Sequence, residues 1–236
     1  MSAEAGPGAA PGLGEKKLDY FWTVLAVDPV AFPVVRFLAR RRWLTPDQVT
    51  WASMAVGLLV GPAYLFGRAG LIAGAVLFYL SFVLDCVDGK LARLTGSSSG
   101  KGEMLDKLAD GARRASAASG LALYLWDPWP PRCIDGAGCV ELGHPATFWW
   151  AVAFGLLTFY FMEISGGDRP PTRSAAGGRL ARALARRRLL GTPGMPDVAA
   201  LVFVLGPLTG LVVPALVVGV VLVALAILRA MVRLAR

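Results

Sequence analysis

Long apolar runs alternate with short polar segments along most of the chain. The first four runs cover residues 47–66, 70–92, 104–126 and 147–165. Each is close to the roughly 20 apolar residues that a helix needs to cross a bilayer. A last run, 198–228, is long for one span and short for two, and Gly210 and Pro214 near its middle favour a reversal. The pattern predicts an all-α integral membrane protein with six transmembrane helices.

Two segments precede these runs. Residues 1–18 are rich in Ala, Gly and Pro and lack the apolar stretch of a signal peptide, so we expect a disordered tail. Residues 19–45 combine aromatic side chains with arginines 40–42. This composition predicts an interfacial amphipathic helix on the cytoplasmic leaflet, with its apolar face toward the lipid; a soluble linker is the alternative. Residues 46–236 form the transmembrane domain.

The first run has a recognisable start. Thr45 is a suitable N-cap, Pro46 suits the first helical position, and Gln48 completes a capping box. We therefore expect a helix that begins at Pro46.

Composition and charge support a membrane protein. Hydrophobic residues make up 56% and charged residues 17%, against about 45–50% and about 25% in soluble domains, yet the net charge is +8. Nucleic-acid binding fits poorly, because the apolar runs leave no soluble domain to carry a basic face. The basic surplus is typical of a membrane protein whose cations lie on one side.

The cations distinguish five spans from six. With six spans and both termini cytoplasmic, only Arg68 and Arg132 of the 24 lysines and arginines lie outside. Five spans would place the three arginines of the C-terminal tail outside, against the positive-inside bias. We therefore predict a multi-pass cell-membrane protein with both termini in the cytoplasm.

Four carboxylates stand at the cytoplasmic ends of the second and third runs. Asp85 and Asp88 are three residues apart and Asp106 and Asp110 four apart, so each pair shares one helix face. The short connection 94–101 makes the two helices antiparallel neighbours, so the pairs can converge. Such pairs are commonly solvated surface, but ionisable groups at membrane level are expensive and are typical of functional sites.

Converging carboxylates repel one another and need cations between them. An all-oxygen set suits Mg²⁺ or Mn²⁺, which also bind substrate phosphates. Gly89 lets a ligand approach the helix closely, and Arg93 offers a guanidinium fork for phosphate. These residues predict a metal and phosphate site at the cytoplasmic face.

The string Asp85-x2-Asp88-Gly89-x2-Ala92-Arg93-x8-Gly102-x3-Asp106-x3-Asp110 resembles the signature of the CDP-alcohol phosphotransferase family, with every fixed position present. The segment Pro46-Asp47-Gln48-Val49-Thr50, the six spans and the preceding interfacial helix are also similar to that family. Within it, the chain is most similar to phosphatidylinositol-phosphate synthases.

The resemblance implies a role for each matching residue. Asp85, Asp88, Asp106 and Asp110 would hold two Mg²⁺ or Mn²⁺ ions, and Asp110 would also accept the proton of the acceptor hydroxyl. The contacts to the nucleotide and its diphosphate would be Asp47, Thr50, Gly89, Ala92, Arg93, Ser99 and Gly102. The chain departs from its relatives at Lys101, where they often carry an aromatic residue, and at Gly100, where some carry Arg.

The implied reaction transfers a substituted phosphate from a CDP-alcohol, expected to be CDP-diacylglycerol, to a polar acceptor alcohol such as inositol phosphate or glycerol phosphate, with release of CMP. The expected acceptor contacts are Lys101, Arg113, Arg114, Arg169 and Arg173. For the arginines of the loop after the fourth run, ordinary positive-inside charge is the alternative. A different donor or acceptor, a cation transporter that uses the four aspartates, and an inactive scaffold are the other functions considered.

Two further expectations concern assembly and the outer loop. Cys133 and Cys139 lie in a predicted external loop, where a disulfide can form. Small residues along the first and fifth spans, together with the family resemblance, lead us to expect a homodimer.

Overall fold

The computed structural model describes residues 18–41, 43–97, 99–126, 145–165, 187–190 and 193–234. Within these ranges every regular element is a helix, and the one isolated β-bridge joins Asp19 to Leu189. Three predictions concern residues outside these ranges. They are the disordered tail, of which only residue 18 is described, the disulfide between Cys133 and Cys139, and the acceptor contacts Arg169 and Arg173. The all-helical prediction is confirmed for the part of the chain described.

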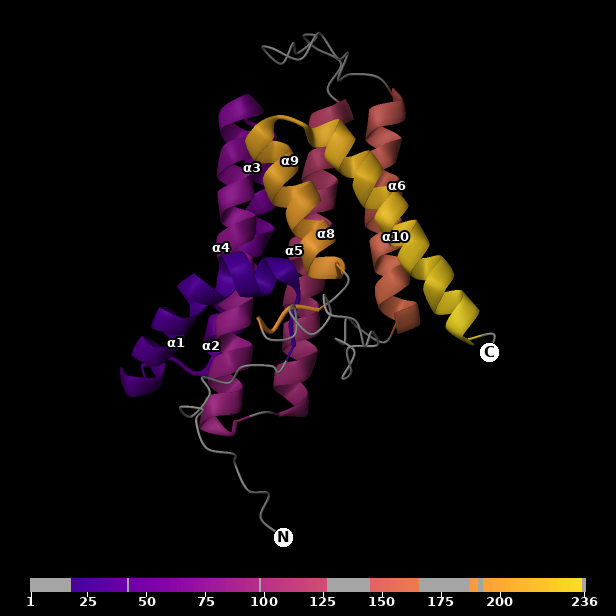
Figure 1. Ribbon diagram of the computed structural model, residues 1–236. Helices are drawn as coiled ribbons and strands as arrows, with labels where there is room; N and C mark the ends of the chain where they lie inside the picture. Colours follow the sequence, from indigo (N-terminus) through magenta and orange to yellow (C-terminus); the bar gives the residue numbers. More distant parts are fainter. Residues whose placement is uncertain are drawn as a thin grey trace.

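Within the described residues, six helical segments pack in a bundle, and their direction alternates along the chain (Figure 1). They are α2 (Pro46–Leu58) with α3 (Val60–Tyr64); α4 (Gly67–Thr95); α5 (Gly100–Trp126); α6 (Pro145–Ser165); α8 (Met195–Ala200) with η2 (Leu201–Leu205) and α9 (Gly206–Thr209); and α10 (Val212–Leu234). The end of α4 and the start of α5 therefore lie together at one end of the bundle, drawn at the bottom of Figure 1.

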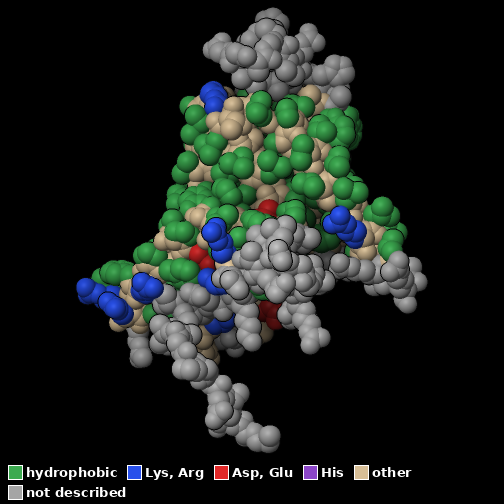
Figure 2. Space-filling view, in the orientation of Figure 1, with side chains coloured by type: hydrophobic (Ala, Val, Ile, Leu, Met, Phe, Trp, Pro, Cys, Tyr) green, Lys and Arg blue, Asp and Glu red, His purple; other side chains and the backbone are tan. Residues whose placement is uncertain are grey.

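Two helices of the described part are long and apolar enough to cross a membrane by themselves, namely α4 and residues 212–232 of α10. Residues 147–162 and 195–209 form shorter apolar helices. Hydrophobic side chains cover the visible face of the bundle, while most of the visible Lys and Arg side chains lie toward its lower end (Figure 2). The count of six crossings stays a prediction.

The segment before the bundle packs against it. The π-helix η1 (Thr23–Val27) leads into α1 (Asp28–Arg41), which crosses the lower end of the bundle at an angle (Figure 1). Val27 at the end of η1 and Ala31, Val35 and Leu38 of α1 are buried against α4, in a hydrophobic cluster that also contains Val49 of α2. The apolar face that we expected to meet lipid is thus turned toward the protein in large part. An interfacial position of α1 remains a prediction.

The predicted start of the first helix is confirmed. The hydroxyl of Thr45 accepts a hydrogen bond from the Gln48 amide at 3.3 Å, and the Gln48 side chain accepts one from the Thr45 amide at 2.9 Å. The connection between α4 and α5 is shorter than predicted, because both helices extend into 94–101. Gly96 ends α4 in the left-handed conformation at φ 65°, which favours glycine.

The predicted reversal near Gly210 is also confirmed. Gly210 has φ 80° and separates α9 from α10, which pack against each other. At the same end, the Arg68 guanidinium donates to the carbonyl oxygens of Pro207 and Leu208, both at 2.6 Å. Arg68 thus satisfies helix-terminal carbonyl groups.

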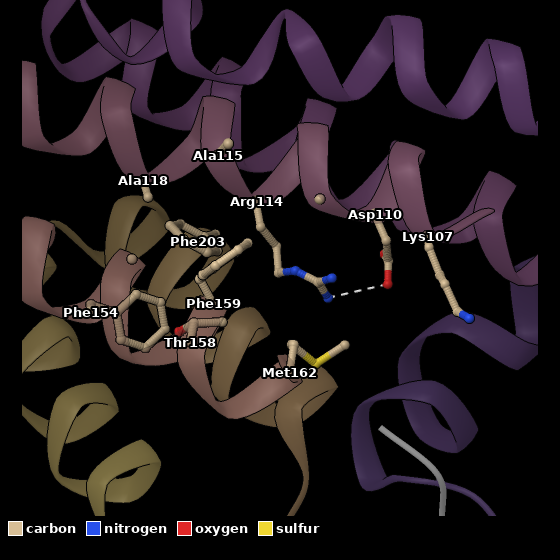
Figure 3. Close-up of a pocket in the computed structure, with 12 residues that line it drawn as sticks. Lys107, Asp110, Arg114, Ala115, Ala118, Phe154, Thr158, Phe159, Met162 and Phe203 are labelled. Carbon is tan, nitrogen blue, oxygen red and sulfur yellow. Dashed lines mark hydrogen bonds and ion pairs between the residues drawn. The ribbon is translucent and has the colours of Figure 1, made fainter. Parts of the chain in front are cut away.

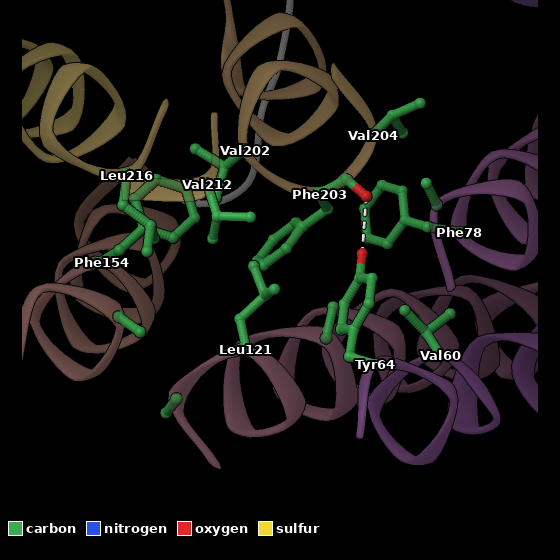
Figure 4. Packing of buried hydrophobic residues seen from close by; sticks show 14 of the residues in the cluster. Val60, Tyr64, Phe78, Leu121, Phe154, Val202, Phe203, Val204, Val212 and Leu216 are labelled. Carbon is green, nitrogen blue, oxygen red and sulfur yellow. Dashed lines mark hydrogen bonds between the residues drawn. The ribbon is translucent and has the colours of Figure 1, made fainter. Parts of the chain in front are cut away.

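The core depends on close helix approach. The Tyr64 hydroxyl donates to the carbonyl oxygen of Phe203 at 2.6 Å, and Phe203 packs between Phe78 and Phe154 (Figure 4). Beside this cluster α3 and α5 touch backbone to backbone, because a Cβ added to Gly120 would lie 2.4 Å from the Cα atom of Gly61. Only glycine permits this contact.

The contact between Gly61 and Gly120 predicts that a methyl group added at Gly120 lowers the stability of the protein. We expect Gly120→Ala to lower the free energy of unfolding by about 1–3 kcal/mol, since α3 and α5 must separate. Gly111→Ala is the matched control on the same helix, because its Cβ would meet nothing within 4 Å and alanine favours helix. Thermal unfolding in detergent, followed by circular dichroism, measures both. Equal melting temperatures for the two variants would contradict the close approach.

Candidate active site

The four aspartates of the motif lie on α4 and α5 at the lower end of the bundle, but they face different surroundings. Asp88 and Asp106 line one cavity and Asp110 lines another. Asp85 lines neither, and its side chain is only 15% exposed. The structure therefore brings the acidic pairs to one region, with three of the four aspartates divided between two cavities and Asp85 at neither.

The first cavity, here called the α2–α4–α5 cavity, has a volume of about 480 Å³. Its lining consists of Pro46, Asp47, Thr50, Asp88, Gly89, Ala92, Arg93, Ser97, Ser99, Gly102, Glu103 and Asp106. All seven residues that we predicted as nucleotide and diphosphate contacts are among them. Their role stays a prediction, but residues from three helices and a connecting loop meet in one place.

The glycines of this cavity provide space beside polar groups. A Cβ added to Gly89 would lie 3.4 Å from a terminal nitrogen of Arg93, and one at Gly102 would lie 3.3 Å from the Ser99 hydroxyl. Ser99 also accepts a hydrogen bond from the Gly102 amide at 3.1 Å, in the first turn of the long helix α5. A guanidinium, a hydroxyl and a helix N-terminus facing one space suit a phosphate group.

The second cavity, the α5–α6 cavity, has a volume of about 400 Å³ and an uneven lining (Figure 3). Lys107, Asp110 and Arg114 lie at one end, and the Arg114 guanidinium donates to Asp110 at 3.1 Å. The aromatic rings of Phe154 and Phe203 lie toward the other end (Figure 3). A ligand here would meet charge close to Asp110 and apolar surface beyond it.

The predicted acceptor contacts separate in the structure. Arg114 lines the α5–α6 cavity, whereas Lys101 is exposed and lines neither cavity. Arg113 is buried behind Asp110. Its guanidinium pairs with Asp110, lies 3.4 Å from both Asp85 and the Ser81 hydroxyl, and stacks near two phenylalanine rings. Of the three described members, only Arg114 therefore faces a space that a ligand could enter.

The residues present fit a divalent metal ion by their chemistry. Oδ1 of Asp85 and Oδ2 of Asp88 are buried and lack a hydrogen-bond partner, which is unusual for carboxylate oxygens. Such oxygens are ligands that Mg²⁺ and Mn²⁺ prefer. Within the described ranges, however, no three Asp, Glu, His or Cys side chains lie close enough to share an ion. Ligands from a substrate would complete the coordination.

Sequence reasoning missed a buried ionic cluster next to the motif. Lys90 follows Gly89 on α4, and its ammonium lies 2.9 Å from the carboxylate of Asp28 on α1. Arg188 lies 3.3 Å from the same carboxylate. The cluster fastens α1 and the segment 187–190 to the end of α4. The signal available in the sequence was Asp28 itself, because it is a charged residue at the start of the otherwise apolar buried stripe of α1.

These observations define an all-helical protein with an acidic site at one end of its bundle, beside a cavity suited to phosphate. A comparison with family models agrees. The chain belongs to the CDP-alcohol phosphatidyltransferase family, whose model matches residues 43–169, slightly more than half of the chain. The match runs from the start of α2 past the end of α6 and includes the whole motif. Members of this family are integral membrane proteins.

Two curated relatives match over part of their length. A phosphatidylinositol phosphate synthase of Streptomyces avermitilis is 30% identical over 122 residues, which are 52% of this chain and 49% of the relative. A bifunctional IPC transferase and DIPP synthase of Rubrobacter xylanophilus is 34% identical over 161 residues, 64% of this chain and 32% of the relative. The chain thus spans about half of the first relative and about a third of the second.

The buried ion pairs of Asp28 predict that a single substitution at this residue lowers the free energy of unfolding substantially. Asp28→Asn leaves Lys90 and Arg188 facing a neutral group, and breaking a buried pair in this way typically costs about 3–5 kcal/mol. The matched control is Lys107→Gln, which removes the exposed 2.9 Å pair with Glu103 and should cost about 0.5 kcal/mol or less. Chemical unfolding in detergent compares the two. A comparable, small effect of both would show that the cluster does not hold α1 in place.

Proposed function

We propose that the chain transfers a substituted phosphate from a CDP-alcohol to the hydroxyl of an acceptor alcohol and releases CMP. One observation carries the proposal. The seven motif and entrance residues predicted to contact the nucleotide and diphosphate line one cavity together with Asp88 and Asp106, and Asp110 lines a second cavity one helical turn further along α5. The two substrates of such a reaction need two adjoining spaces of this kind.

The donor occupies the α2–α4–α5 cavity. Its diphosphate lies near the Arg93 guanidinium and the first turn of α5, where positive charge and the helix N-terminus stabilise it. The motif aspartates would hold Mg²⁺ or Mn²⁺ here, and the bound metal would supply neutralisation of the charge on the diphosphate. Because the family is membrane-integral, CDP-diacylglycerol is the donor we propose, with its acyl chains in the bilayer.

The acceptor occupies the α5–α6 cavity, with its hydroxyl next to Asp110. The hydroxyl oxygen attacks the β-phosphorus, a new P–O bond forms, and the bond from that phosphorus to the oxygen bridging to CMP breaks. CMP leaves with the bonding electrons, and the carboxylate of Asp110 receives the hydroxyl proton. This displacement is direct and needs no covalent intermediate.

The acceptor itself is proposed to be a phosphorylated polar alcohol. Lys107 and Arg114 place two cations beside Asp110, and a phosphate on the acceptor would pair with them. Inositol phosphate and glycerol phosphate both carry such a group. We further propose six membrane crossings with both termini and the site at the cytoplasmic face, and a homodimer.

The role of Asp110 has a direct test. In purified protein with Mg²⁺, CDP-diacylglycerol and an acceptor, we expect Asp110→Asn to lower the rate of CMP release by about 10²-fold or more, as for the loss of a general base. Met104→Gln is the control on the same helix, because Met104 is exposed and lines neither cavity. CMP release at the normal rate from Asp110→Asn would remove Asp110 from this role.

The same preparation distinguishes the transferase from a cation transporter. A transferase is stabilised against heat by CMP in the presence of Mg²⁺, because both bind the folded state. A cation path formed by the aspartates has no reason to respond to CMP. Stabilisation by Mg²⁺ alone, with no effect of CMP, would favour the transporter.

The acceptor pocket predicts a selective change in KM. We expect Arg114→Met to raise the KM for a phosphorylated acceptor about tenfold or more, because it removes a charge-assisted hydrogen bond, while the KM for the donor stays within twofold. A panel of alcohols with and without a phosphate, with products identified by mass, measures the effect. An equal rise in both KM values would contradict a separate acceptor cavity.

A further inference from the structure

Thr158 on α6 carries a buried hydroxyl that the proposed mechanism does not use. Its side chain is 5% exposed, and Oγ1 is shielded from solvent without a hydrogen-bond partner among the described residues. Such a hydroxyl lowers stability, because it loses its hydrogen bonds to water on folding and forms none within the protein. Native proteins rarely keep a buried polar group in this state unless it serves a purpose.

Three other threonines in helices show the bond that Thr158 lacks. The hydroxyls of Thr50, Thr95 and Thr209 each donate to the carbonyl oxygen four residues earlier, at 3.1, 2.9 and 2.7 Å. This bond is a common way for a helix to satisfy a threonine. Thr158 does not form it with the carbonyl oxygen of Phe154, although both residues lie within α6. Its hydroxyl therefore stays available to a group from outside the helix.

The position of Thr158 is the second observation. Phe154, Thr158 and Met162 follow one another at four-residue spacing, so they share one face of α6, and all three line the α5–α6 cavity (Figure 3). Oγ1 itself is out of reach of solvent in the structure. A change of χ1 between the two rotamers that threonine populates in helices would present the hydroxyl to the cavity.

The separation of Thr158 from Asp110 indicates the size of the group that could meet both. A Cβ added to Gly155 would lie 3.3 Å from the Cβ of Ala118, so these two residues mark one level of the antiparallel helices α5 and α6. By the rise of a helix, Ala118 is about 12 Å beyond Asp110, and Thr158 is about 4.5 Å back toward it. Thr158 and Asp110 are therefore roughly 7 Å apart along the bundle. A ligand that meets both needs polar groups on opposite sides of its carbon skeleton.

We propose that Thr158 is a specificity-determining residue of the α5–α6 cavity, whose hydroxyl bonds a second hydroxyl of a phosphorylated polyol. The nucleophilic hydroxyl of that polyol lies next to Asp110, its phosphate pairs with Lys107 and Arg114, and a hydroxyl on the far side of the skeleton meets Thr158. Oγ1 can both donate and accept, which suits a hydroxyl partner. This proposal rests on the proposed function, because it concerns the alcohol that the transferase would accept.

The lining of the cavity makes Thr158 decisive at this depth. Among the described residues that line it, Thr158 has the one polar side chain besides Lys107, Asp110 and Arg114. A ligand hydroxyl beyond Arg114 therefore either meets Thr158 or stays unpaired in apolar surroundings. A site that pairs a substrate hydroxyl discriminates against an analogue without it more strongly than an apolar pocket discriminates by size.

The test measures the dissociation constant of inositol phosphate from the purified full chain in detergent, without donor. We expect Thr158→Val to raise this constant about tenfold, as for the loss of one hydrogen bond, and Thr158→Ser to stay within threefold of the wild type. A set of inositol phosphates that each lack one ring hydroxyl identifies the partner. One of them should bind the wild type about tenfold more weakly than the parent and should be unaffected by Thr158→Val. A further loss for every analogue would show that Thr158 acts otherwise than through a hydrogen bond, and would overturn the proposal.

The stability of the variants separates a ligand contact from a structural one. Without ligand, we expect Thr158→Val to melt at the temperature of the wild type or above it, because a methyl group of similar shape replaces an unpaired hydroxyl. Thr209→Val is the matched control, since its hydroxyl bonds within its own helix and the residue lines neither cavity. It should melt at a lower temperature and bind inositol phosphate within twofold of the wild type. A lower melting temperature for Thr158→Val with unchanged binding would show that the hydroxyl serves the fold.

The remaining outcomes keep this inference apart from the proposed function. Unchanged binding by Thr158→Val, or no binding of inositol phosphate to the wild type, would overturn the inference, while CMP release with another acceptor alcohol would still support the transferase. The expected loss of binding, in a protein that releases no CMP from CDP-diacylglycerol, would support the contact and count against the proposed reaction.

Discussion

The mutual repulsion of four carboxylates at the end of two apolar helices is the constraint on which the rest of this structure depends. Asp85 and Asp88 on α4 lie at the same end of the bundle as Asp106 and Asp110 on α5, and an apolar environment strengthens the repulsion between them. Positively charged side chains of the same protein reduce this repulsion. Arg113 and Arg114 pair with Asp110, and Arg113 reaches Asp85 from a slot lined by Phe78 and Phe82.

Small residues make this arrangement possible. Gly57 leaves room on α2 for the base of the Arg113 side chain, and Gly61 lets α3 touch α5 at Gly120. The three helices are thus drawn together by glycine contacts in the apolar half of the bundle and by ion pairs in the polar half. Groups that repel one another are held in place only when the helices that carry them are fixed by other contacts. In this protein the glycine contacts between α2, α3 and α5 provide that support.

The sequence was sufficient for every feature that depends on local pattern. The apolar runs, the capping box at Thr45 and the reversal at Gly210 follow from spacing and from residue type. The features that it could not provide depend on contacts between distant segments. Asp28 and Lys90 meet only because α1 packs across α4. Arg113 and Arg114 are neighbours in sequence, about 100° apart around the helix, and only the packing of α2 and α4 decides which of them is buried.

The same distinction bears on the departure from the family pattern at Gly100 and Lys101. Both residues are exposed in the first turn of α5, and neither lines either of the two cavities. Within the described part of the chain, these two residues therefore do not contact a space in which an acceptor could be selected. Under the proposed function, the α5–α6 cavity would select the acceptor, since Lys107 and Arg114 lie at one end and Phe154 and Phe203 toward the other. Selectivity would follow from how an alcohol divides its phosphate and its carbon skeleton between these two ends.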